Sequence, residues 1–191
     1  MRYSIVTGVG KSIVLIGMMG AGKSSVGRCL HSRTGLAVLD IDEVVVSKFG
    51  MSISEIFAEH GEKKFRDVET ETLRRAKTEE QTIIITGGGI VLRKENVEIL
   101  RSQTVIVWLD GKEETLFARA SQKRNRPLLQ TKDPRKSFAA ILGARRPLYA
   151  NIADIRIDTS ILTDEEVAVA ILAKLRTINP KPKSRIPAKA S

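Results

Sequence analysis

Short apolar runs alternate with longer segments in which apolar and polar residues mix. Five of these runs are rich in Val, Ile and Thr, as buried strands are, and they lie at residues 12–16, 36–39, 82–86, 104–109 and about 155–157. The segments between them have the lengths and patterns of helices. Strands that alternate with helices in this way predict an α/β fold, in which a five-stranded parallel sheet is sandwiched by helices.

Residues at the ends of the mixed segments locate the helix boundaries. The patterns S-x-x-E at residues 52–55 and T-x-x-E at 163–166 are typical of capping boxes, which start helices. Asp133 followed by Pro134 also favours a helix start. Gly35 follows a predicted helix and is a typical residue at a helix end. The expected helices run from about residue 25 to 33 and then over about 43–49, 52–61, 62–79, 94–101, 113–120, 134–149 and 163–177.

The length favours one domain, which we place at residues 12–178. Residues 1–11 are expected to be a loose lead-in, and residues 179–191 a disordered basic tail. The formal net charge is +10, but the tail holds four Lys or Arg residues and no acid, and the lead-in holds two more. The charge alone therefore does not predict nucleic-acid binding.

The chain has one cysteine, Cys29, so neither an intrachain disulfide nor a cysteine zinc cluster can form. The N-terminal residues lack the pattern of a signal peptide, and no apolar run is long enough to span a bilayer. These features predict a cytoplasmic protein that does not contact a membrane.

The sequence GMMGAGKS at residues 17–24 lies between the first predicted strand and the first predicted helix. It matches the P-loop pattern G-x-x-x-x-G-K-[ST], whose backbone N–H groups cradle phosphate oxygens at the positive end of a helix. Lys23 would reach the β- and γ-phosphates of a nucleotide, and the Ser24 hydroxyl would ligate Mg²⁺. The residues expected to contact ATP are Gly20, Ala21, Gly22, Lys23, Ser24 and Ser25.

Two further motifs directly follow predicted strands: DID at residues 40–42 and GGG at residues 87–89. Ligands of parallel sheets bind beyond the carboxyl ends of the strands, so both motifs should face the same cleft as the P-loop. If the strand continued through Asp42, the carboxylates of Asp40 and Asp42 would project to one side. One could then hold Mg²⁺ through water while the other orients a substrate hydroxyl. The alternative is that one of them only caps the next helix.

These motifs belong to an ordered set that resembles the shikimate kinase family, within the nucleoside-monophosphate-kinase-like group of P-loop proteins. The set continues with ISEIF at 53–57, GE at 61–62, FRDVE at 65–69, RPLL at 126–129 and RRPLY at 145–149. Many NTPases share the P-loop, whereas the ordered set is far more specific. The resemblance implies ATP-dependent phosphorylation of the 3-hydroxyl of shikimate, with Mg²⁺, in the biosynthesis of chorismate and aromatic amino acids.

The resemblance also implies roles on the acceptor side. Asp40 would help to hold Mg²⁺ through water, and Asp42 would bind the substrate hydroxyls and polarise the attacking one. Arg66 and Arg145 would bind the shikimate carboxylate, because a planar guanidinium matches its two oxygens. The backbone of the GGG motif would also approach the substrate, since no Cβ intervenes; its residues are Gly87, Gly88 and Gly89.

On the nucleotide side, the resemblance implies two more arginines. Arg126 would lie on a mobile lid at about residues 121–133 and stabilise the transferring phosphoryl group, so the implied catalytic residues are Lys23, Asp42 and Arg126. Arg119 would lie near the adenine. Closure of the lid would exclude water, which competes as an acceptor.

Several alternatives stay open at this stage. Arg146 competes with Arg145 for the carboxylate, although the spacing to residues 147–149 favours Arg145. Another small-metabolite or nucleotide kinase could use the same scaffold. A GTPase-type switch is not favoured, since N-K-x-D and D-x-x-G motifs are absent, and a nucleic-acid-binding protein is not favoured, since clustered aromatic residues are absent. We expect shikimate and ATP as partners, no nucleic acid, and a monomer.

Overall fold

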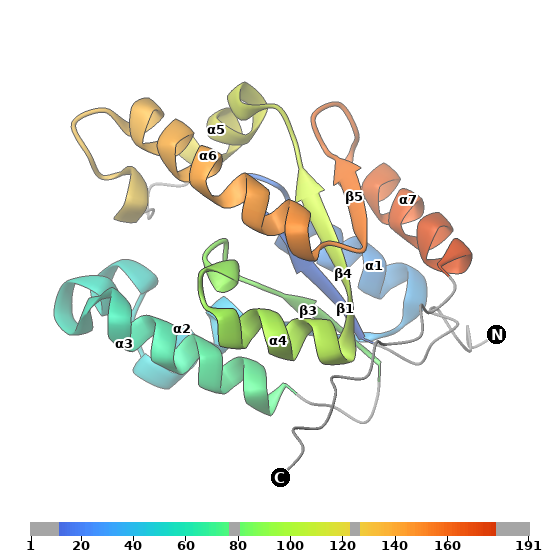
Figure 1. Ribbon diagram of the computed structural model, residues 1–191, viewed down its shortest axis with the longest axis horizontal. Coiled ribbons are helices and arrows are strands. Elements are labelled where there is room, and N and C mark those ends of the chain that lie inside the picture. Colours follow the sequence, from blue (N-terminus) through green and yellow to red (C-terminus); the bar gives the residue numbers. More distant parts are fainter. Residues whose placement is uncertain (1–11, 77–80, 123–126, 179–191) are drawn as a thin grey trace, which may run out of the picture.

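The computed structural model describes residues 12–76, 81–122 and 127–178, so the predicted lead-in and tail lie outside the described residues (Figure 1). The strands are β1 (Ser12–Ile16), β2 (Ala37–Asp40), β3 (Thr82–Ile85), β4 (Thr104–Asp110) and β5 (Ile155–Asp158). The α-helices are α1 (Lys23–Thr34), α2 (Ile41–Phe49), α3 (Ile53–Arg75), α4 (Lys94–Gln103), α5 (Glu113–Ser121), α6 (Pro134–Ile152) and α7 (Asp164–Thr177). Two 3-10 turns, η1 (Ile90–Leu92) and η2 (Pro127–Leu129), complete the described elements.

The five strands form one parallel sheet in the order β2-β3-β1-β4-β5. β1 lies at its centre, and the four residues of β1 after Ser12 are completely buried. Because the strands are parallel, their carboxyl ends meet at one edge, where the P-loop and the segments after β2 and β3 begin. The predicted α/β architecture is therefore confirmed.

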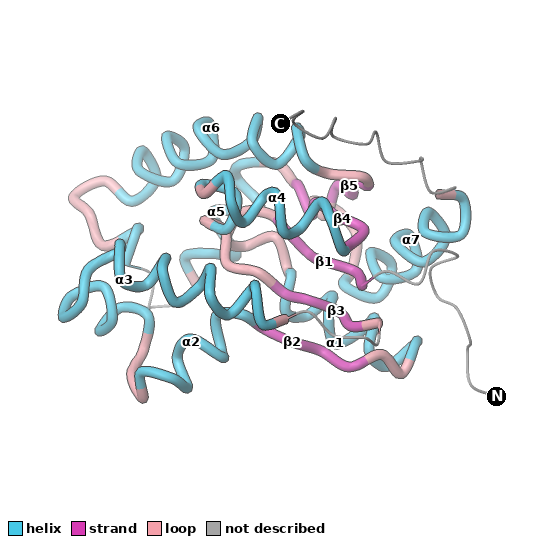
Figure 2. The backbone as a smooth tube through the Cα atoms, turned by 60° about the horizontal axis from the view of Figure 1, so that its bottom comes forward, coloured by secondary structure: helices cyan, strands magenta, loops and turns pink. Residues whose placement is uncertain are grey.

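Helices cover both faces of the sheet (Figures 1 and 2). α1 and α7 pack against each other on one face, whereas α4 lies on the other face beside α3. All seven residues of β4 are buried, as expected for a strand covered from both sides, and Trp108 is a core residue, as predicted. Within the described ranges, no helix has the length and apolar character needed to cross a membrane.

The predicted helix caps are present. Both capping boxes form, at the starts of α3 and α7. Asp133 accepts a hydrogen bond from the backbone N–H of Lys136 at the start of α6. Gly35 ends α1 in the left-handed conformation and donates to the carbonyl oxygen of His31. These local signals help to position α1, α3 and α6, three of the helices that contribute to the site.

The break predicted at Gly61 is present, since α3 kinks there and Gly61 is non-helical with a φ of 77°. Two other predicted boundaries differ from the structure. Strand β2 ends at Asp40, and α2 begins at the next residue, so the strand does not continue through Asp42. In the predicted lid, Ser121 ends α5 and η2 forms at Pro127–Leu129, while residues 123–126 lie outside the described residues.

Candidate active site

The P-loop joins β1 to α1. Gly20 and Gly22 both have a φ of 86°, a conformation that residues with a side chain rarely adopt. A Cβ on Gly20 would also collide with the carbonyl oxygen of Leu116. Gly22 is the N-cap of α1, and no side chain in the described part of the chain caps this helix end. The N–H groups of the first turn are therefore left for a ligand such as phosphate.

Lys23 turns back toward the start of the P-loop. Its ammonium donates to the carbonyl oxygens of Gly17 at 2.8 Å and Met18 at 3.1 Å. A cation is thus placed beside the N–H groups of the loop, an arrangement that attracts anions.

Ser24 and Asp40 meet beside the P-loop. The Ser24 hydroxyl donates to Oδ2 of Asp40 at 3.2 Å. Oδ1 of Asp40 accepts from the backbone N–H groups of Asp42 at 3.0 Å and Glu43 at 3.4 Å, so Asp40 caps α2. Asp40 therefore caps α2 through one carboxylate oxygen, but it does not only cap, because its second oxygen faces Ser24.

Asp42 lies in the first turn of α2 and not on a strand. The condition under which strand alternation would aim the two carboxylates to one side is therefore not met, because the chain turns into a helix directly after Asp40. Both residues nevertheless line the P-loop cavity. A Cβ on Gly87 would lie 2.7 Å from Oδ1 of Asp42. Asp42 thus packs against the segment that follows β3.

Two cavities adjoin at the carboxyl edge of the sheet. The P-loop cavity encloses about 830 Å³ and is lined by the P-loop and the start of α1, by the segments that follow β2, β3 and β5, and by Arg119. The arginine cavity encloses about 80 Å³ and is lined by Arg66, Arg145 and residues 87–89, which we call the glycine turn. Met19, Asp42 and Gly88 line both cavities. The predicted convergence of the three motifs at one edge is confirmed, and Asp42 lies at the junction.

Arg66 and Arg145 bring two buried cations to the arginine cavity from different helices. Arg66 of α3 is 8% exposed, and Arg145 of α6 is 7% exposed. The apolar part of the wall consists of Met19, Ile53, Phe57, Phe65, Pro127 and Leu128. Two guanidiniums at a small, largely apolar cavity suit a compact molecule that carries a carboxylate.

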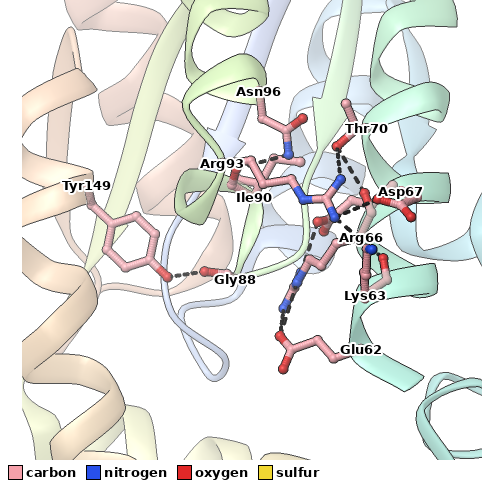
Figure 3. A network of polar contacts seen from close by, with 11 residues as sticks. Glu62, Lys63, Arg66, Asp67, Thr70, Gly88, Ile90, Arg93, Asn96 and Tyr149 are labelled. Carbon is pink, nitrogen blue, oxygen red and sulfur yellow. Dashed lines mark hydrogen bonds and ion pairs between the residues drawn. The ribbon is translucent and has the colours of Figure 1, made fainter.

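Two carboxylates hold Arg66 in place (Figure 3). Nη1 donates to Oε2 of Glu69 at 2.9 Å, and Nε and Nη2 donate to Oε1 of Glu62 at 3.2 and 3.0 Å. Burial by itself would lower the pKa of Arg66, but attraction to Glu69 and hydrogen bonds with both carboxylates outweigh burial and raise the pKa. Arg66 is therefore a fixed, permanent cation.

Glu69 is completely buried behind Arg66. Burial raises the pKa of Glu69, and the attraction of Arg66 opposes that rise. Among the described residues, Oε1 of Glu69 has no hydrogen-bond partner, and a Cβ on Gly87 would lie 2.9 Å from it. Glu69 therefore lies directly against the glycine turn while its other oxygen holds Arg66.

The other two residues of the glycine turn also lie near side chains of the site. A Cβ on Gly88 would lie in ordinary contact, at 3.5 Å, with both Nη1 of Arg145 and the hydroxyl oxygen of Tyr149. A Cβ on Gly89 would collide with the guanidinium of Arg66. The absence of a side chain at Gly89 is therefore what leaves room for Arg66 at the cavity.

Replacing Gly89 with alanine is expected to lower the thermal stability of the protein. The Arg66 guanidinium cannot simply move aside, because Glu62 and Glu69 hold it, so overpacking should cost about 1–3 kcal/mol. A cost of this size lowers the unfolding midpoint by about 2–4 °C per kcal/mol in a chain of this length.

Gly143→Ala is the matched control for Gly89→Ala. A Cβ on Gly143 meets nothing within 4 Å, and Gly143 lies inside α6. Alanine there should raise the midpoint, since it favours a helix by up to about 1 kcal/mol over glycine. Scanning calorimetry of both variants measures the difference, and equal midpoints would contradict the packing of Gly89 on Arg66.

The structure separates Arg145 from Arg146. Nε and Nη2 of Arg146 donate to Oδ1 of Asp110 at 3.3 and 3.2 Å, and Nη2 also donates to the carbonyl oxygen of Gly111 at 2.6 Å. Asp110 is 2% exposed, and its other oxygen pairs with Arg156 at 2.6 Å. Arg146 is therefore part of a separate ion-pair cluster, and Arg145 is the residue of the doublet that lines the arginine cavity.

Arg119 lines the P-loop cavity. Its guanidinium donates to the hydroxyl of Thr159 at 3.3 Å and to the carbonyl oxygen of Thr159 at 3.0 Å, so it is anchored on the segment after β5. Arg126, the predicted lid arginine, lies outside the described residues.

Comparison with known proteins decides the family. The family model described as shikimate kinase matches residues 19–176, which is most of the chain. The chain belongs to the shikimate kinase family. A shikimate kinase from Thermodesulfovibrio yellowstonii is 44% identical over 169 residues, which cover 88% of this chain and 97% of that protein.

Solved structures of family members agree with this fold. The structure of a shikimate kinase from Acinetobacter baumannii in complex with shikimate has a TM-score of 0.84 and 34% identity, and the match covers 87% of this chain and 93% of that one. A shikimate kinase from Aquifex aeolicus has a TM-score of 0.76 and 34% identity, covering 86% and 95% of the two chains. The P-loop kinase fold predicted from the sequence is confirmed.

Several residues that this shikimate kinase fold brings to the site have no individual role predicted from the sequence. Glu69 follows Arg66 by three residues and Tyr149 follows Arg145 by four, spacings at which side chains share a helix face. These spacings are a signal that could have found both residues. Met19 lines both cavities, but it occupies a variable position of the P-loop pattern, so no local signal identifies it.

Proposed function

We propose that this chain transfers the γ-phosphoryl group of ATP to the 3-hydroxyl of shikimate. One observation carries the proposal: the P-loop cavity and the arginine cavity adjoin at Asp42. Family membership makes the chain an ATP-dependent small-molecule kinase. Phosphoryl transfer depends mainly on positioning and charge stabilisation, so a phosphate site and an acceptor site in contact are what the reaction needs.

The P-loop cavity would bind ATP. Its phosphates would lie against the backbone N–H groups of residues 20–25, with Lys23 supplying positive charge to the β- and γ-phosphates. Arg119 lines the same cavity and would lie near the adenine. Arg126 would complete the catalytic set by stabilising charge on the transferring phosphoryl group.

The arginine cavity would bind shikimate. Arg66 and Arg145 would form charge-assisted hydrogen bonds with its carboxylate, and the apolar wall would contact the ring. The glycine turn would approach the ring and its hydroxyls closely. Two buried arginines at the acceptor site favour an anionic acceptor over an uncharged sugar. The cavity is small and its wall is largely apolar, which suits a compact carboxylate better than a nucleotide.

Asp42 would orient the attacking hydroxyl. It lines both cavities, so its carboxylate can accept a hydrogen bond from a hydroxyl that lies between the two substrates. That hydrogen bond would aim an oxygen lone pair at the γ-phosphorus. The Asp42 carboxylate would receive the hydroxyl proton as the new P–O bond forms and the bond from the γ-phosphorus to the bridging oxygen of the leaving ADP breaks. Lys23 and Arg126 would offset the negative charge that moves toward the β-phosphate.

Ser24 and Asp40 would hold Mg²⁺. In the described part of the chain, no three His, Cys, Asp or Glu side chains cluster into a metal site, but Mg²⁺ in kinases keeps several waters and needs few protein ligands beside the phosphates. The Ser24 hydroxyl and Oδ2 of Asp40, 3.2 Å apart at the P-loop, fit this demand. When bound, Mg²⁺ would neutralise part of the phosphate charge and fix the geometry of the phosphates.

An ADP-release assay tests the proposal. The purified chain is incubated with ATP and Mg²⁺ together with shikimate, gluconate or a nucleoside monophosphate. We expect ADP formation to depend on shikimate and to stay near background with the other two acceptors. Absence of shikimate-dependent turnover from folded protein would overturn the proposal, and turnover with gluconate alone would assign a different acceptor to the arginine cavity.

We further propose that the chain works as a monomer without nucleic acid. The two cavities together contain the residues proposed to bind phosphate, Mg²⁺ and the carboxylate, so neither needs a group from a second copy. Sedimentation should give the mass of one chain, and a mixture with short RNA at moderate salt should show no mobility shift.

A further inference from the structure

We propose that Tyr149 is a positioning residue of the acceptor site, whose hydroxyl orients the glycine turn and Arg145 for the substrate carboxylate. The inference rests on the proposed function. Tyr149 lies in α6 and is completely buried. Its hydroxyl donates to the carbonyl oxygen of Gly88 at 2.5 Å (Figure 3).

The partner of this hydrogen bond links Tyr149 to the arginine cavity. Gly88 lines both the arginine cavity and the P-loop cavity. A peptide unit is planar, so holding the Gly88 carbonyl also fixes the direction of the Gly89 N–H in the same plane. The single bond from Tyr149 therefore sets the orientation of a peptide group in the wall of the acceptor site.

Tyr149 also lies beside Arg145. The two residues are four apart in α6 and so share one face of the helix. A Cβ on Gly88 would lie 3.5 Å from both Nη1 of Arg145 and the Tyr149 hydroxyl oxygen, which places the three groups together. Tyr149 thus couples the helix that carries Arg145 to the glycine turn.

The hydroxyl is not needed to fill space. The ring of Tyr149 packs 6.0 Å from the ring of Trp108, centroid to centroid, and a phenylalanine ring would keep this contact. Burial raises the pKa of Tyr149 to about 12, while Arg145 opposes the rise. The phenol is therefore protonated, and able to donate, across the pH range in which enzymes are assayed.

Tyr149→Phe tests the inference, because it removes only the hydroxyl. We expect the KM for shikimate to rise roughly tenfold, as for the loss of one buried hydrogen bond next to a ligand. The kcat should stay within about threefold of the wild-type value, and the KM for ATP should not change, since the P-loop keeps its own contacts. An unchanged KM for shikimate would overturn the inference.

Thr104→Val is the matched control. Thr104 is also buried, and its hydroxyl donates to the carbonyl oxygen of Leu100 at 2.8 Å, but it begins β4 and so lies at the sheet edge opposite the site. This variant loses a buried hydrogen bond of the same kind, from a side-chain hydroxyl to a backbone carbonyl oxygen. Its KM for shikimate should stay at the wild-type value. If Thr104→Val raised that KM as much as Tyr149→Phe does, the effect would be one of general stability and the inference would be overturned.

A double variant separates positioning from folding. Because Tyr149 acts in part through Arg145, adding Tyr149→Phe to Arg145→Ala should raise the KM for shikimate by less than it does in the wild type. A full additional rise would overturn this coupling.

Loss of the cooperative unfolding transition in Tyr149→Phe alone would assign the hydroxyl to folding and would also overturn the inference. If the wild-type protein did not phosphorylate shikimate, the proposed function itself would be overturned. The outcomes for the variants bear only on the role of Tyr149 and leave the proposed function intact.

Discussion

Replacing Asp42 with asparagine is expected to lower kcat by about 10²- to 10⁴-fold, the range found when a positioned general base is lost. Asparagine keeps the size of the side chain, but its amide cannot accept the proton of the attacking hydroxyl. ATP affinity should change little, because the phosphates would be bound by the P-loop and Lys23. Steady-state kinetics and calorimetric titration with a non-hydrolysable ATP analogue measure the two effects.

Glu43→Gln is the control for Asp42→Asn. Glu43 is the next residue of α2 and lines the P-loop cavity but not the arginine cavity. The substitution removes the same charge one position away, so any general effect of lost negative charge on ATP or Mg²⁺ would appear in both variants. Equal loss of kcat in the two variants, or an equal loss of ATP affinity in Asp42→Asn, would contradict the role proposed for Asp42.

Replacing Arg145 with alanine is expected to raise the KM for shikimate by roughly 30- to 1,000-fold, which corresponds to about 2–4 kcal/mol for a buried charged contact. The loss should be in acceptor binding, since Arg145 lines only the arginine cavity. The KM for ATP should stay near its wild-type value. Titration with shikimate in the assay described above measures the change.

Arg146→Ala distinguishes the two residues of the doublet. Arg146 is bound to Asp110 and does not line the arginine cavity. Its removal should lower the thermal stability, because a buried carboxylate loses one of its two arginine partners, and it should leave the KM for shikimate unchanged. The reverse pattern, with Arg146→Ala weakening shikimate binding more than Arg145→Ala, would move the carboxylate site to Arg146.

Local sequence signals account for most of the fold. The five strands, both capping boxes and the C-terminal glycine of α1 were all readable from short patterns, because periodicity, capping and backbone conformation depend on residues within a few positions of one another. The P-loop is likewise a short local pattern. Alternation of strands and helices then predicts a parallel sheet, and a parallel sheet brings the P-loop, Asp42 and the glycine turn to one edge.

Local signals do not predict the direction of individual side chains, and two residue pairs illustrate the reason. Asp40 and Asp42 are separated by the transition from β2 to α2, so the alternation of a strand no longer relates their carboxylates. Arg145 and Arg146 are neighbours in α6, where successive residues point about 100° apart. Which of them meets the glycine turn depends on how α6 packs on the sheet.

The sequence by itself therefore determined the order of elements, the phosphate-binding loop, the family resemblance and the edge at which the site forms. Only the tertiary structure decided that Arg145 enters the cavity while Arg146 pairs with Asp110, 36 residues away, and that Tyr149 reaches Gly88, 61 residues away. Contacts over such separations depend on the packing of whole helices against the sheet, which buries some side chains at the site and turns their neighbours elsewhere. The spacing to residues 147–149 favoured Arg145 without excluding Arg146, and no short pattern predicts that Tyr149 contacts Gly88.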